Sequence, residues 1–117
     1  MATYSKQLLS GSSQGAPILI AATSSPGTVV HTTGTSSTTI DNVTLYLSNA
    51  DSTARLATIE HGSTSNVIKV TVPAQSGLML VLPQIPLTGT GAATKTCAVF
   101  CATTNVVSAS GFVDRVS

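Results

Sequence analysis

The chain has 117 residues, the length of one domain, and only 8% of them are Asp, Glu, Lys or Arg, with a formal net charge of +1. A globular domain usually contains about 25% charged residues; here 16 Ser and 19 Thr take up the difference. The five basic residues are scattered along the chain, which excludes a nucleic-acid-binding surface, because such a surface neutralises several phosphates together. Near-zero charge with a mean hydropathy of +0.37 favours a protein whose surface is covered by partners.

The first fifteen residues are polar and contain two glycines, with Leu8 and Leu9 as an apolar anchor. We expect residues 1–15 to form an extended N-terminal arm that orders on contact with a partner through Tyr4, Leu8 and Leu9; a frayed terminus is the alternative. No basic segment followed by an apolar core is present, so no signal peptide is expected. The longest apolar run, residues 78–82, is too short to cross a bilayer, so no membrane partner is expected.

Residues 16–117 contain a series of short runs of β-type residues separated by turn residues. Val43, Leu45 and Leu47 alternate with polar residues, as expected of a half-buried antiparallel strand. No window has the periodicity of an amphipathic helix. The sequence therefore predicts an all-β domain over 16–117, a single antiparallel β-sandwich that is jelly-roll-like or Ig-like. The expected strands cover residues 18–22, 28–33, 43–48, 55–60, 67–72, 78–82, 96–103 and 112–116.

Residue types that carry catalysis are few. The four carboxylates, at positions 41, 51, 60 and 114, lie beside turn residues or at strand ends, where such groups usually accept local hydrogen bonds. His31 and His61 are interpreted as ordinary polar positions, and no Gly-x-Ser-x-Gly motif accompanies them. We expect no enzymatic activity, no cofactor and no metal.

Cys97 and Cys101 lie four residues apart in one expected strand, which separates them by about 13 Å on the same face. A disulfide needs Cα atoms within about 7 Å, so the two cysteines cannot pair with each other. Two interpretations stay open. They are free thiols that act as small apolar residues, or Cys97, Val99 and Cys101 form an apolar interface stripe with intersubunit disulfides, while residues 98, 100 and 102 face the core.

Three blocks, residues 43–62, 68–83 and 98–116, together suggest a family. Their marks are the Leu-Tyr-Leu-Ser-Asn strand, the Val-Pro-Ala-Gln-Ser-Gly-Leu turn and the closing Gly-Phe-Val-Asp-Arg-Val strand. In order and spacing they resemble small β-sandwich virion proteins of tailed bacteriophages, encoded among the head and neck genes. The resemblance implies a fold and a setting, without catalytic residues. This chain departs from the family at His61, where an aromatic residue is common, and at both cysteines.

The resemblance implies a capsid decoration (cement) protein that stabilises the head shell through protein–protein contacts. Its partners would be the major capsid protein or other virion proteins, and it would be a homo-oligomer, with a trimer favoured. It would reside in the virion, assembled in the host bacterial cytoplasm. The alternatives are a neck, collar or tail structural component, or a small β-sandwich binding module for carbohydrate or peptide.

Overall fold

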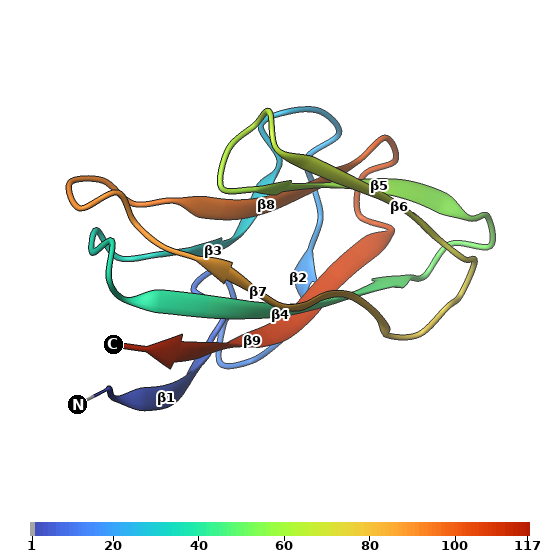
Figure 1. The fold of residues 1–117 in the computed structure, drawn as a ribbon. Coiled ribbons are helices and arrows are strands. Elements are labelled where there is room, and N and C mark those ends of the chain that lie inside the picture. Colours follow the sequence, from blue (N-terminus) through green and yellow to red (C-terminus); the bar gives the residue numbers. More distant parts are fainter. Residues whose placement is uncertain (1) are drawn as a thin grey trace.

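The computed structural model describes residues 2–117, which form nine β-strands in two antiparallel sheets (Figure 1). All eight expected strands have counterparts, and one further strand precedes them. No helix in this range could span a membrane. The strands are β1 (Tyr4–Leu8), β2 (Ile18–Leu19), β3 (Thr28–Thr32), β4 (Ile40–Asn49), β5 (Arg55–His61), β6 (Val67–Val72), β7 (Met79–Leu87), β8 (Thr96–Cys101) and β9 (Val107–Val116).

The strand order identifies the type of sandwich. Sheet A has the order β1-β9-β4-β7, with β2 also paired to β9, and sheet B has the order β3-β8-β5-β6. The first half of the chain therefore pairs with the second half as a nested hairpin: β5 with β6, β4 with β7, β3 with β8, and β1 and β2 with β9. This is the order of a jelly roll. The expected all-β sandwich is confirmed.

The core lies between the two sheets, which form the upper and lower layers of Figure 1. Val43, Leu45 and Leu47 of β4 are fully buried, which confirms the alternation seen in the sequence. In β6, Val72 is buried but Ile68 is exposed, because β6 is the edge strand of sheet B. The other large core residues are Leu9, Ile20, Val30, Ile59, Leu82, Val99 and Val107.

The N-terminal segment differs from the expected arm. Tyr4–Leu8 is strand β1, which pairs antiparallel with the second half of β9, and Leu9 is 1% exposed in the core. The domain boundary expected at residue 15 is therefore wrong, because the sandwich begins at Tyr4. The physical reason is the length of β9: ten residues long, it offers an edge that both β1 and β2 use. Met1 lies outside the described residues.

The edge strands carry features that oppose pairing with another sheet. In sheet A, Lys6 lies in the middle of β1, and Pro83 and Pro86 interrupt the hydrogen-bonding potential of β7. In sheet B, Lys69 lies in β6, and the pairing of β3 shifts register between residues 29 and 31. Charged side chains, prolines and bulges are the usual protections of a sheet edge. The edges are therefore poor sites for pairing with the strands of another sheet.

Candidate functional site

A buried polar cluster joins the two sheets. Asp41 of β4 is 1% exposed and accepts hydrogen bonds from Arg115 of β9, from Nε to Oδ1 at 2.7 Å and from Nη2 to Oδ2 at 3.1 Å. His31 of β3 is equally buried, and its Nε2 lies 2.7 Å from the same Oδ2. Asp41 and Arg115 belong to sheet A and His31 to sheet B, so the cluster ties the layers together.

Ser10 completes a Ser-His-Asp set, but its geometry is not that of a hydrolase. The main-chain N–H of Ser10 donates to Nδ1 of His31 at 3.1 Å, and its hydroxyl accepts from the N–H of Thr32 at 2.6 Å. Since a main-chain N–H can only donate, Nδ1 carries a lone pair, and Nε2 carries the proton that is donated to Asp41. A catalytic triad needs the serine hydroxyl on the imidazole. This cluster is structural.

The charge of Asp41 is stabilised in the folded protein. Burial by itself raises the pKa of this carboxyl, but hydrogen bonds from Arg115 and His31 and the charge of Arg115 outweigh burial and hold the pKa below its ordinary value. The same contact raises the pKa of Arg115. The pair is therefore charged, and the charges neutralise each other.

The other carboxylates also serve structural contacts. Glu60 is buried and accepts from the hydroxyl of Ser25 at 2.6 Å and from the N–H of Gly27 at 2.7 Å, which anchors the loop before β3. Asp51 binds the guanidinium of Arg55. The expectation of local acceptors holds for Asp51 and is wrong for Asp41, Glu60 and Asp114, whose partners include residues at least 30 positions away.

The two cysteines lie in the core. Cys97 is 0% exposed, Val99 and Cys101 are equally buried, and both thiols are free. The interface stripe expected from these three residues is therefore wrong: they face inward, and Phe100 lies on the outer side of β8. Burial raises the pKa of Cys97 to about 12, so it is an unreactive thiol. Among residues 2–117, no group of three His, Cys, Asp or Glu side chains could hold a metal ion.

His61 lies beside a surface depression of about 630 Å³. Its Nε2 donates to the carbonyl of Pro86 at 3.1 Å, and its Nδ1 finds no hydrogen-bond partner within the described residues. Ser63, Asn66 and Lys95 also line the depression. Its described lining contains no Tyr, Phe or Trp, so it offers no aromatic surface on which a sugar ring could stack.

The outer face of sheet A carries large apolar side chains. Tyr4 is 76% and Leu8 55% exposed, so these two residues of the expected contact segment do lie on the surface, whereas Leu9 is in the core. The strand register aligns outward residues in rows across β1, β9 and β4. The rows are Tyr4–Val116–Ile40, Lys6–Asp114–Asn42 and Leu8–Phe112–Thr44. Two exposed leucines extend this face: Leu19 of β2, and Leu80 of β7, which is the cross-strand partner of Tyr46.

The middle row is polar and holds one charge of each sign. Lys6 and Asp114 are direct cross-strand partners. The Lys6 ammonium lies 4.3 Å from the centroid of the Phe112 ring, and Asp114 accepts a hydrogen bond from Gln84 at 2.7 Å. The outer face of sheet A is therefore an apolar surface with a central, electrically neutral polar row.

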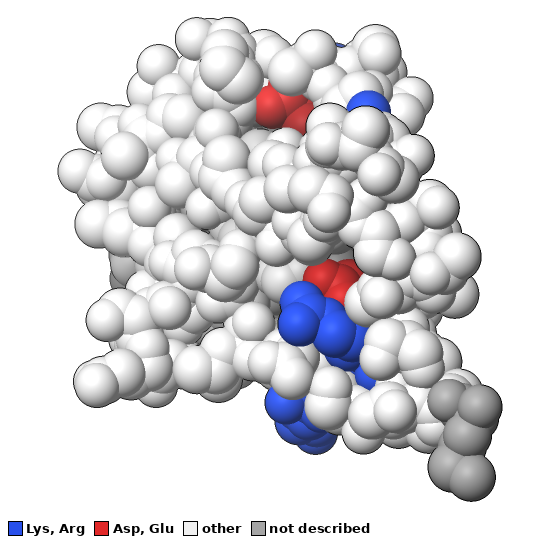
Figure 2. All heavy atoms as spheres, turned by 90° about the vertical axis from the view of Figure 1, so that its left-hand side faces the viewer, with Lys and Arg blue, Asp and Glu red and all other residues white. Residues whose placement is uncertain are grey.

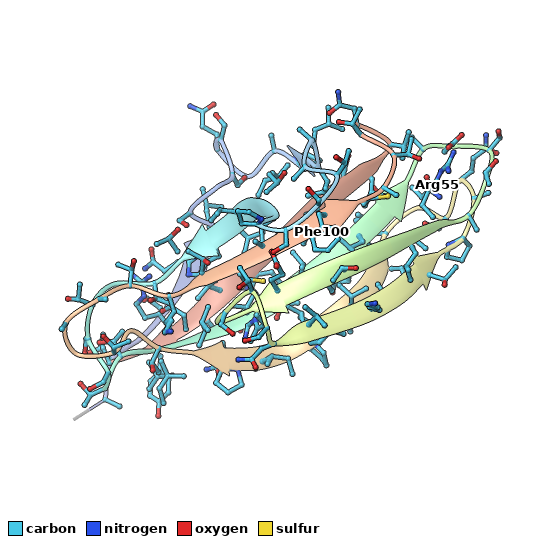
Figure 3. All side chains as sticks on the ribbon, turned by 90° about the horizontal axis from the view of Figure 1, so that it is seen from above. Arg55 and Phe100 are labelled. Carbon is cyan, nitrogen blue, oxygen red and sulfur yellow. The ribbon has the colours of Figure 1, made fainter. Side chains whose placement is uncertain are left out.

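The outer face of sheet B is the second apolar surface. Val29, Leu56 and Val67 are exposed there. In Figure 3, which looks down on this sheet, Phe100 lies over its middle and Arg55 toward one end.

Figure 2 shows one end of the sandwich. Few charged side chains lie on it, and at one place an acidic side chain lies against a basic one.

Sequence reasoning missed most of these surface residues. Four of them lie in expected strands or next to them: Leu19, Ile40, Leu56 and Leu80. Because neighbouring residues of a strand point to opposite faces, each one's position next to an inward-facing residue could have indicated that it faces outward. Comparison of the chain with protein-family models, with curated proteins and with solved structures finds no match.

Proposed function

We propose that this chain is a structural protein of a tailed-bacteriophage virion: a capsid decoration protein that binds other virion proteins through the outer faces of its two sheets. The observation that carries the proposal is the exposure of large apolar side chains on both faces. They are Tyr4, Leu8, Leu19, Ile40 and Leu80 on sheet A, and Val29, Leu56 and Val67 on sheet B.

Several apolar side chains on one sheet face favour contact with another protein. Each Å² of apolar surface that the contact removes from water stabilises the complex by about 25 cal/mol. A net charge of +1 adds little long-range repulsion between copies. The protected edges direct association to the faces. Two faces on opposite sides also let one copy bind the shell and a neighbour together, so that weak contacts on a lattice reinforce one another.

The interior of the protein also supports a structural role. The buried polar groups, Asp41 with Arg115 and His31, and Glu60 with its loop, are all used to hold the fold. The jelly roll is a common fold of viral capsid domains, an analogy that supports the setting but carries no function by itself. The three sequence blocks that resemble phage virion proteins support it further.

The test is the composition of purified particles of the phage that encodes the chain. Quantitative mass spectrometry after extensive washing should find it in a fixed ratio to the major capsid protein, and particles made without it should lose DNA at a lower temperature. A ratio of only a few copies per particle would instead indicate a component of the neck or tail. Absence from washed particles, in spite of abundant synthesis during infection, would overturn the proposal.

A further inference from the structure

We propose that the outer face of sheet A binds a second copy of this chain, about a two-fold axis that lies in the interface parallel to the strands, between β1 and β9. The inference rests on the proposed function, since it names one of the contacts that a structural subunit would make. It is carried by the arrangement of charges and apolar side chains in the three rows.

The charges determine where the axis lies. A two-fold axis along the strands between β1 and β9 places β1 of one copy over β9 of the other. Because Lys6 and Asp114 share one row, this operation brings Lys6 against the partner's Asp114 and Asp114 against the partner's Lys6. An axis across the strands would instead oppose Lys6 to the partner's Lys6. One basic and one acidic residue side by side are self-complementary only in the first arrangement.

The apolar rows follow the same operation. Tyr4 comes to lie over the partner's Val116, and Leu8 over the partner's Phe112, on either side of the charged row. Because sheets are twisted, strands away from the axis diverge from those of the facing copy, so contact is closest near the axis. The contact of the Lys6 ammonium with the Phe112 ring holds this side chain over β9, close to the axis.

The area that this dimer buries is small. Only β1, β2 and β9 face the partner, because β4 and β7 of each copy lie beyond the partner's β1 edge. The exposed parts of Tyr4, Leu8 and Leu19 amount to roughly 350 Å² per copy, at about 200 Å² for a whole side chain. A standard specific interface covers about 800 Å² per partner, so these apolar side chains provide less than half of it and the polar row adds to it. The dimer is therefore a weak one, which a lattice of copies would reinforce. The self-complementary row favours a dimer over the trimer that the family resemblance implies.

The test uses sedimentation equilibrium of the full chain and of two charge-reversal variants. Lys6→Asp makes the row doubly negative and Asp114→Lys makes it doubly positive, so each variant alone should self-associate about tenfold or more weakly than the wild type. An equimolar mixture of the two should recover wild-type affinity, because every facing pair is again of opposite sign. Lys69→Asp, on β6 of the other sheet, makes the same charge change and should leave self-association unchanged.

Circular dichroism and thermal unfolding establish that each variant is folded; if a charge variant is not, Leu8→Ser, at an exposed site, replaces it and should also weaken the dimer. A wild-type chain that stays monomeric at millimolar concentration would overturn the inference, and so would a mixture that associates no better than its components. Either failure would leave the composition of purified particles unaffected, so it would not count against the proposed function.

Discussion

Asp41 and Arg115 are direct partners across β4 and β9, joined by two hydrogen bonds, and the same carboxylate holds His31 of the opposite sheet at 2.7 Å. One fully buried acidic side chain thus connects three strands and both layers. Loss of this side chain should therefore lower the free energy of unfolding and change how it depends on pH.

Asp41→Asn should destabilise the fold by about 3 kcal/mol, because it weakens the charge-assisted hydrogen bonds that this buried carboxylate accepts from Arg115 and His31. Urea unfolding followed by circular dichroism measures the loss. Asp51→Asn is the matched control: it removes an ion pair with Arg55 whose carboxylate is 23% exposed, against 2% for Asp41, and solvent-accessible pairs contribute little. Equal losses in the two variants would contradict a special role of the buried cluster.

The pH dependence follows from the sign of the pKa shift. Because the pKa of Asp41 is lowered on folding, its carboxylate contributes stability in full above its ordinary value of 3.8 and loses it as the pH falls through the lower folded value. The difference in stability between wild type and Asp41→Asn should therefore be constant from about pH 7 to about pH 5 and shrink toward about pH 2. A difference that grows on acidification would have the wrong sign.

Leu8 and Leu9 form a matched pair for the N-terminal segment. Leu9→Ala should cost about 2–5 kcal/mol, the usual cost of emptying a core site, because Leu9 is 1% exposed. Leu8→Ala should cost about 0.5 kcal/mol or less, as surface changes usually do. Equilibrium unfolding of both variants measures this, and a flexible arm would instead leave both variants as stable as the wild type.

The thiols of Cys97 and Cys101 should be inert in the folded protein, because both are buried and the pKa of Cys97 is about 12. A chromogenic disulfide reagent should react with them only at the rate at which the protein opens. On non-reducing gels the protein from purified particles should run as a monomer. Fast, stoichiometric reaction without unfolding, or covalent ladders that reductant removes, would show that one of the thiols is accessible.

The sequence predicted the class of fold well and its faces less well. Strict alternation in residues 43–48 identified a half-buried strand, since only one set of residues there is apolar. In residues 97–102 both alternate sets are apolar, so periodicity cannot say which one faces inward. Tertiary pairing decides it: Val99 is in register with the buried Ile59 of β5. Strand β1 was missed because Tyr4–Leu8 mixes polar and apolar residues, and only its pairing with β9 makes it a strand.

The buried cluster was beyond the reach of the sequence. Asp41 and Arg115 are 74 residues apart and become neighbours only because the nested hairpin brings β4 and β9 together. A lone aspartate after a polar stretch has the same local pattern as a turn acceptor, which is why it was interpreted as one. The self-complementary row of Lys6 and Asp114 likewise depends on the register of two distant strands.

Binding of the purified chain to phage particles that lack it tests the central claim most directly. Co-sedimentation should show saturable binding, with a plateau at a fixed number of chains per capsid protein. Leu56→Ser on the outer face of sheet B should weaken this binding. Leu78→Ser, at a more exposed leucine in the loop before β7, should not. If the wild-type chain stays in the supernatant at every concentration, the chain is not a structural component of the particle.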